Sequence, residues 1–469
     1  MRAQRFSTNV FLGSKLLTKK RRGRQHSRES CITESLELRT LLTAGACGHA
    51  DSHDHDVDLD SDSDHDGHVH SHDDQTHDHE HAYDCECQCQ HCLGHAHPLY
   101  AEGTDPSYMD EHPDLLQEEG SSNNFRTSSR WQLTANQSGF SDGDATVLTW
   151  SIVADGTGIP GYNGEPESDS DLIARLEEIF GSTGDNDSDF TDEPWFPYFD
   201  DMFERWEDIS GLTFDYEPAD DGVDIGTSRG SLGVRSDIRI GGHPIDGNSN
   251  VLAYAFSPNT GDVVIDTNDS TLASTSNDYI NFRNVMAHEV GHSIGISHVE
   301  SSNANFLLEP FLATSFDGPQ FDDILASHRL YGDALEVGDN DTAANATALG
   351  TLTEGSSISI GTDGDATSVA VDDTDFVSID DDSDIDYFSF DAPVAGFVDV
   401  TLTPQGPTYN EGPQGGSQSS FDASAQSDLE LKFYDTDGTT LLASASSTTA
   451  GNAETLTVPL PSSGTFFFV

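Results

Sequence analysis

The feature that most constrains the fold is the segment 288–298, which reads HEVGHSIGISH. His288 and His292 are four residues apart, so both imidazoles project from one face of a helix predicted over 281–294 and can bind one metal ion. Gly295 can adopt the positive φ that ends a helix, and this turn would bring His298 to the same ion. Three neutral protein ligands and one open position are typical of catalytic rather than structural zinc.

Glu289 stands beside this histidine pair, where its carboxylate can reach a zinc-activated water without binding the metal. Zinc lowers the pKa of its water to about 7 and polarises a peptide carbonyl. Glu289 would take the proton of the attacking water as general base and deliver it to the leaving amine as general acid. The segment therefore predicts a zinc-dependent metalloendopeptidase that acts on protein or peptide substrates.

Two other hypotheses belong to different functional classes. The first is an extracellular metal-binding surface or matrix protein with a weak or inactive protease domain. The second is an adhesion module that depends on the C-terminal region alone. The glutamate at position 289 favours the enzyme, because a silenced site has no need of a general base.

The eleven-residue pattern resembles that of the metzincin proteases, and its surroundings are similar to the matrixin branch, the matrix metalloproteases. The runs that carry the resemblance are 244–247 (PIDG), 251–258 (VLAYAFSP), 261–266 (GDVVID), 321–324 (FDDI) and 330–332 (LYG). The resemblance covers about 145–333. It implies an α+β zincin catalytic domain, in which a mixed twisted sheet packs on a long active-site helix.

The same resemblance implies further sites. Asp246, Asp266 and Asp269 would supply carboxylates to a structural calcium ion, which prefers oxygen ligands, although they could also be ordinary turn aspartates. An edge strand with Leu252 and Ala253 would pair with an extended substrate, and a segment that starts at Pro310 would line the specificity pocket.

This chain also departs from the matrixin pattern. Tyr254 and Val264 stand where matrixins have ligands of a second, structural zinc ion, so one catalytic zinc and no structural zinc is expected. Leu308 stands in the place of the methionine beneath the zinc, and its similar volume could preserve that apolar base. The matrixin cysteine motif that blocks the zinc is absent, and a cysteine within 85–92 could take that role.

Charge and hydropathy limit the classes of partner that this chain can bind. The chain has 20 Lys and Arg against 84 Asp and Glu, and a formal net charge of −64. Such a surface repels phosphate, which excludes nucleic acid as the expected partner. No run of 18 apolar residues is present, so no membrane span is expected. The basic N-terminus followed by LELRTLLTA resembles the start of exported planctomycete proteins and predicts a secreted, extracellular or cell-surface protein.

Composition divides the chain into four regions. Residues 1–47 form the basic export-type segment, and 48–118 are a low-complexity His/Asp/Cys-rich region expected to be disordered, with possible extra transition-metal binding by 48–98. Residues 119–335 are the predicted catalytic domain. Short strand-like runs in 336–469 predict an all-β sandwich that resembles the bacterial pre-peptidase C-terminal domain. The chain ends within the expected last strand, which predicts that this domain is incomplete.

Overall fold

The structure is a computed structural model that describes residues 96–469, except 105–126, 162–163, 185–189, 381–383 and 447–448. The predicted export segment 1–47 therefore lies outside the described residues. So do the cysteines of 85–92 and nearly all of the proposed metal-binding tract 48–98.

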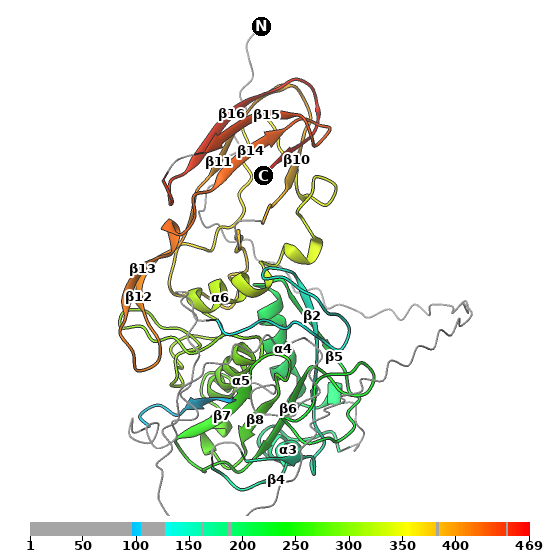
Figure 1. Cartoon of the computed structure of the whole chain (residues 1–469), viewed down its shortest axis with the longest axis vertical. Helices are drawn as coiled ribbons and strands as arrows, with labels where there is room; N and C mark the ends of the chain where they lie inside the picture. Colours follow the sequence, from blue (N-terminus) through cyan, green and yellow to red (C-terminus); the bar gives the residue numbers. More distant parts are fainter. Residues whose placement is uncertain (1–95, 105–126, 162–163, 185–189, 381–383, 447–448) are drawn as a thin grey trace, which may run out of the picture. The chain divides into compact units, whose positions relative to one another are not determined.

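A six-stranded mixed sheet forms the body of the catalytic region (Figure 1). Its strands, in sheet order, are β1 (Ala96–Tyr100), β7 (Val251–Phe256), β8 (Val263–Asp266), β6 (Ile238–His243), β2 (Thr146–Ile152) and β5 (Leu212–Tyr216). β2 runs parallel to β5 and β6, whereas β7 runs antiparallel to both of its neighbours. This arrangement agrees with the predicted α+β class. β1, however, lies before the predicted domain start at 119.

Four helices accompany the sheet. They are α3 (Leu172–Phe180), α4 (Phe196–Glu207), α5 (Ile280–Ser293) and α6 (Phe321–Tyr331). α5 is the helix predicted from the histidine spacing, and it is buried along nearly its whole length. α4 presents Phe196, Phe199 and Phe203 to Trp150 of β2, with ring centroids 4.5–6.5 Å apart. Trp206 of α4 then donates from Nε1 to the carbonyl of Ala287, which ties α5 to this aromatic core.

The region after α6 contains only strands and short turns among its described residues. Five strands form one sheet in the order β15 (Leu441–Ser446), β14 (Glu430–Tyr434), β17 (Gly464–Phe468), β10 (Phe388–Ala392) and β9 (Thr347–Thr351). β11 (Gly396–Leu402) pairs with β16 (Glu454–Leu460). The two sheets share an apolar core that includes Phe390, Val398 and Phe433, so alternating buried side chains hold them together. Smaller elements elsewhere are β3 (Gly158–Ile159), β4 (Ser168–Asp169) and 3-10 turns at Phe190–Asp192, Ser270–Ala273, Glu336–Gly338 and Ala423–Ala425.

One hairpin of this C-terminal region belongs to the catalytic core rather than to the all-β core. It consists of β12 (Thr408–Glu411) and β13 (Ser419–Asp422). Tyr409 is buried in the same apolar cluster as Phe306 and Phe321, and its hydroxyl donates to Asp322 of α6 at 2.6 Å. The boundary predicted at 335/336 therefore does not separate two independent cores.

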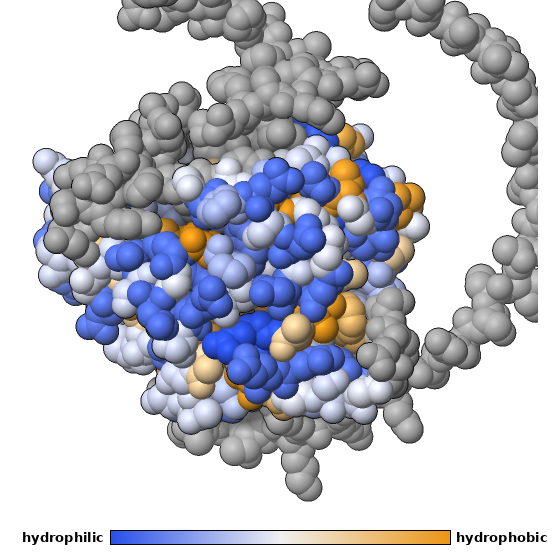
Figure 2. Space-filling view, turned by 90° about the horizontal axis from the view of Figure 1, so that it is seen from below, coloured by the Kyte–Doolittle hydropathy of each residue, from blue (hydrophilic) through white to orange (hydrophobic). Residues whose placement is uncertain are grey.

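The surface in view in Figure 2 is mainly hydrophilic, and its apolar residues are scattered. Among the described helices, none has both the length and the apolar composition that crossing a membrane requires.

A cluster of carboxylates lies where the chain leaves α6 for the all-β region. Asp333 and Asp386 are buried, and single oxygens of Glu336, Asp341 and Asp384 come within 4.8 Å of one another. Burial raises the pKa of Asp333 to about 7, with repulsion from Asp384 adding to it. Burial, and then repulsion from Asp333, also raises the pKa of Asp386. Both carboxyl groups are therefore protonated more readily in the folded chain than in the unfolded one.

This cluster predicts a loss of stability as pH rises. A carboxyl group whose folded pKa is raised stabilises the folded state below its unfolded pKa, and this contribution disappears as pH passes the folded value. In metal-free buffer at pH 8, the melting temperature of Asp386→Asn should be about 2–4 °C higher than that of wild type. The difference should be smaller at pH 5. Calorimetry at both pH values measures this, and equal melting curves at pH 8 would contradict it.

Candidate metal centre

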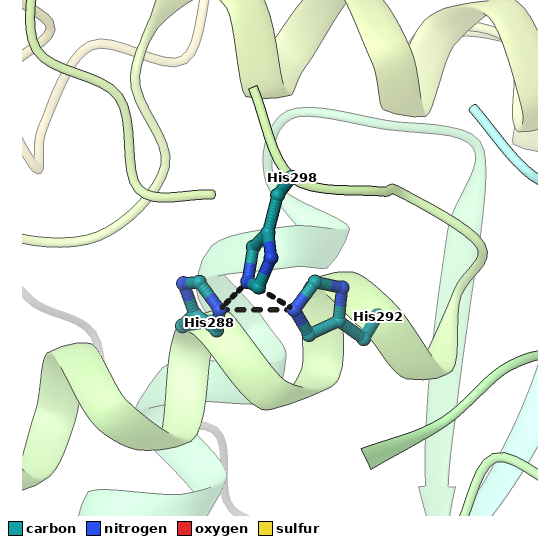
Figure 3. A group of neighbouring side chains, drawn as sticks. All are labelled: His288, His292 and His298. Atoms are coloured by element: carbon teal, nitrogen blue, oxygen red, sulfur yellow. Dashed lines mark hydrogen bonds between the residues drawn. The ribbon is translucent and has the colours of Figure 1, made fainter. Parts of the chain in front are cut away.

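Three histidine side chains meet at one buried point (Figure 3). The Nε2 atom of His288 lies 2.9 Å from that of His292 and 3.2 Å from that of His298, and the last two are 3.1 Å apart. His288 and His292 occupy successive turns of α5, as their spacing predicts. Gly295 ends the helix with φ 98°, and a Cβ there would lie 2.1 Å from the carbonyl oxygen of Ser129. Only glycine therefore allows the turn that returns His298 to the helix.

The opposite nitrogen of each ring has an oxygen acceptor. Nδ1 of His288 donates to the carbonyl of Leu307 at 2.6 Å, and Nδ1 of His292 donates to that of Ile296 at 2.7 Å. Nδ1 of His298 donates to Oε1 of Gln414 at 2.7 Å. An oxygen of this kind can only accept, so each Nδ1 carries the proton and each Nε2 is left with a lone pair.

Three lone pairs that face one another at about 3 Å need a cation between them. Burial, with the nearby His298, lowers the pKa of His288 well below 6.5, and burial with both neighbouring rings does the same for His292. Protonation therefore does not relieve the repulsion. The donor set and its geometry fit a zinc ion bound by His288, His292 and His298.

Glu289 follows His288 on α5 and is fully buried. Among the described residues, neither of its carboxylate oxygens has a hydrogen-bond partner. Burial raises its pKa well above 4.5, so the group binds a proton more readily than an exposed glutamate. A buried carboxylate of this kind is suited to accepting and returning a proton during a reaction.

The turn beneath the histidines is held from α6. Oδ2 and Oδ1 of Asp323 accept from the backbone N–H groups of Leu307 and Leu308, at 2.7 and 3.0 Å. This fixes the Leu307 carbonyl that receives the His288 proton. Leu308 is fully buried, and its methyl groups would lie 2.8–3.1 Å from a Cβ on Gly291, between the two helical histidines. Leu308 thus forms the apolar base that its sequence position predicts.

The predicted substrate residues lie in the two segments that flank β1. Leu252 and Ala253 are in β7, and Pro310 lies in the segment opposite. A pocket beside His288 is lined by the largely apolar side chains of Leu307, Leu312, Ala313 and Phe316, together with Leu99 and Asn284. The strand that lies between these two segments is β1, which the sequence analysis did not include in the site.

The predicted calcium residues form a network around the loop before β7. Asp266 accepts from the N–H groups of Ile245 and Gly247, and Asp269 accepts from that of Ser249. Asp246 accepts from the N–H of Val251. These bonds orient the loop. The carboxylates of Asp246, Asp266 and Asp269 do not form one of the described groups whose ligand atoms all lie within 4.8 Å.

Two residues at the positions of the second, structural zinc have other contacts. Tyr254 donates its hydroxyl to Glu165 at 3.1 Å, and His243 faces the same carboxylate at 3.6 Å. Val264 is buried in an apolar cluster with Tyr254. Neither side chain offers the imidazole nitrogen that matrixins would place there.

Sequence reasoning missed two residues of the site. Gln414 comes from the loop of the β12–β13 hairpin, and nothing in its local sequence marks it as a partner of a histidine. His97 stacks on His292 with ring centroids 4.8 Å apart. A signal for this strand was present, since Pro98, Leu99 and Tyr100 are apolar or aromatic residues at the end of a polar tract.

Gln414 predicts a measurable effect on metal affinity. Gln414→Ala removes the acceptor that fixes the His298 tautomer, so the affinity for the tightest-bound zinc should fall about 10–100-fold. Gln414→Glu keeps an oxygen acceptor and should retain the affinity. Chelator competition measures both, with the exposed Gln418→Ala as the matched control. An unchanged affinity in Gln414→Ala would show that the contact has no role in metal binding.

Comparison with known proteins places this geometry in context. Residues 182–332 match the matrixin family. The hatching enzyme of Paracentrotus lividus is 34% identical over 151 residues, which are 31% of this chain and 24% of the relative. Matrix metalloproteinase-18 of Xenopus laevis is 37% identical over 139 residues (28% and 27%), and karilysin of Tannerella forsythia is 33% identical over 138 residues (28% and 27%). The chain spans about a quarter of the length of these relatives. The matches and the histidine geometry together support a matrixin-like metzincin domain.

Proposed function

We propose that this chain is a secreted zinc-dependent metalloendopeptidase that hydrolyses internal peptide bonds of proteins. One observation carries the proposal: three Nε2 lone pairs converge at a helix that also carries a buried carboxylate, Glu289, with no partner among the described residues. The matrixin match of residues 182–332 supports the same reaction class.

The histidines and Glu289 have different roles in hydrolysis. His288, His292 and His298 would hold a zinc ion, which would supply Lewis acidity for polarising a peptide carbonyl and lowering the pKa of water. Glu289 accepts a proton from the attacking water and transfers it to the nitrogen of the leaving amine. Its buried position excludes bulk water and keeps the carboxylate basic enough for the transfer, since burial raises its pKa.

The cleft is suited to an extended peptide. Leu252 and Ala253 of β7 and the segment that starts at Pro310 lie on either side of β1, so the space between them accommodates an extended segment. Backbone pairing of this kind gives affinity without demands on side chains. The apolar pocket beside His288 would then select one apolar side chain of the substrate.

We also propose that calcium stabilises the loop before β7 through Asp246, Asp266 and Asp269. Asp266 and Asp269 are fully buried, and their carboxylate oxygens accept hydrogen bonds from backbone N–H groups of this loop. The acidic composition supports the proposal. Additional transition-metal binding by residues 48–98 and the pre-peptidase-like nature of 336–469 remain proposals from the sequence.

Glu289→Ala tests the reaction. Loss of the general base should lower kcat/KM for a quenched-fluorescent peptide by about 10²–10⁴-fold, because general acid–base catalysis contributes that range. The full chain is incubated with zinc and calcium before the assay. Zinc content is measured in parallel and should be the same in both proteins. Equal peptide hydrolysis by the variant would refute the role of Glu289, and absence of tightly bound zinc from both would refute the centre.

Removal of calcium tests the second proposal. The Glu289→Ala chain with calcium should melt several degrees higher than the same chain with EGTA, and Asp269→Asn should reduce this difference. A ligand present at about 100 times its Kd stabilises by roughly 2.7 kcal/mol. Calorimetry with zinc held in excess measures the difference in melting temperature. Identical melting curves with and without calcium would refute the proposed calcium site.

A further inference from the structure

A segment of the chain itself lies in the cleft. β1 (Ala96–Tyr100) pairs antiparallel with β7, and Leu99 is opposite Ala253 (Figure 1). On its other side, the N–H of Tyr100 donates to the carbonyl of Pro310 at 3.0 Å, and the N–H of Leu312 donates to the carbonyl of Tyr100 at 2.9 Å. β1 thus joins both backbone edges that are expected to hold a substrate.

The side chains of β1 reach the metal centre and the pocket. The ring of His97 stacks on His292 and meets His298 edge-on, with its centroid 6.5 Å from that of His298. Leu99 is 1% exposed and lines the apolar pocket beside His288. The side chains on either side of Pro98 therefore contact the metal-binding histidines and the pocket, respectively.

The chemistry of the two candidate bonds differs. The nitrogen of the His97–Pro98 bond carries the proline ring and has no hydrogen, and its Cδ crowds the N–H and Cβ of His97. The nitrogen of the Pro98–Leu99 bond is an ordinary amide, and it belongs to the residue whose side chain the pocket holds. The second bond is therefore the better target.

We propose that Ala96–Tyr100 is an intramolecular substrate and that the enzyme cleaves its own Pro98–Leu99 bond. The inference rests on the proposed function. Water adds its hydroxyl to the carbonyl carbon of Pro98, the C–N bond breaks, and a proton transferred by Glu289 completes the amine of Leu99. The products are a segment that ends at Pro98 and a chain that begins at Leu99.

The position of the segment also explains why this reaction occurs within one molecule. β1 packs against α5, the helix that carries Glu289, and Glu289 is 0% exposed. A substrate in trans would have to displace β1, whereas the segment of the same chain is already in place. Cleavage therefore precedes the hydrolysis of other proteins, and the segment keeps the cleft covered until then.

The test uses the full chain, loaded with zinc and calcium. The expected product begins with Leu99, as read by intact mass and N-terminal sequencing. Its first-order rate constant should stay the same, within about twofold, over a hundredfold dilution, because the reaction is intramolecular. Glu289→Ala should stay intact. A product that begins elsewhere, or a rate that falls in proportion to concentration, overturns the proposal.

Leu99→Asp tests whether self-cleavage requires the contact between Leu99 and the apolar pocket. A carboxylate does not enter the apolar pocket, so self-cleavage should fall at least about 100-fold. An added peptide should then be hydrolysed without the lag that wild type shows. Leu232→Asp, a change at a residue that is 59% exposed, is the matched control and should behave as wild type.

A second measurement does not depend on activity. In the Glu289→Ala chain, the amides of Tyr100 and Ala101 should be protected from hydrogen exchange, because they donate to the carbonyls of Pro310 and Asn250. Adding Leu99→Asp should speed their exchange at least about tenfold. Unprotected amides in the Glu289→Ala chain would overturn the proposal.

The outcomes distinguish this inference from the proposed function. Hydrolysis of an added peptide by a wild-type chain whose Pro98–Leu99 bond stays intact overturns the inference alone. Absence of both reactions overturns the proposed function and this inference with it.

Discussion

The metal centre depends on three oxygen atoms that accept the Nδ1 protons of His288, His292 and His298. These bonds turn three Nε2 lone pairs toward one buried point, where only a cation relieves their repulsion. Much of the surrounding structure serves to place the acceptors. Asp323 holds the turn of Leu307, and the tight backbone at Gly295 brings the Ile296 carbonyl back to the helix.

The third acceptor, Gln414, connects the metal centre with the C-terminal region. Its hairpin packs through Tyr409 on the catalytic core and reaches the active-site histidine from there. The region after α6 therefore does more than follow the catalytic domain. A change that loosens this hairpin would act on the tautomer of His298 as well as on packing.

The exposed edge of a sheet offers unpaired N–H and C=O groups, and a protease needs such an edge to hold its substrates. This chain covers the edge of β7 with its own β1. The backbone groups of β7 that a substrate would need are therefore already paired in this structure. The carboxylates of Asp266 and Asp246 accept from the N–H groups of Gly247 and Val251 and so orient the segment that leads into β7.

The sequence by itself determined the histidine helix, predicted over 281–294 and observed as Ile280–Ser293, because its periodicity and spacing are local properties. It also predicted the return of His298 to the helix after Gly295, which the structure shows, whereas the role of Glu289 stays a prediction. β5 was not predicted, since LTFDY is short and follows a helix almost directly. Only the tertiary structure decided the roles of β1 and Gln414. Gln414 is 116 residues from His298. The short apolar run of β1 indicates a strand but not its partner, because these contacts form only when distant segments pack together.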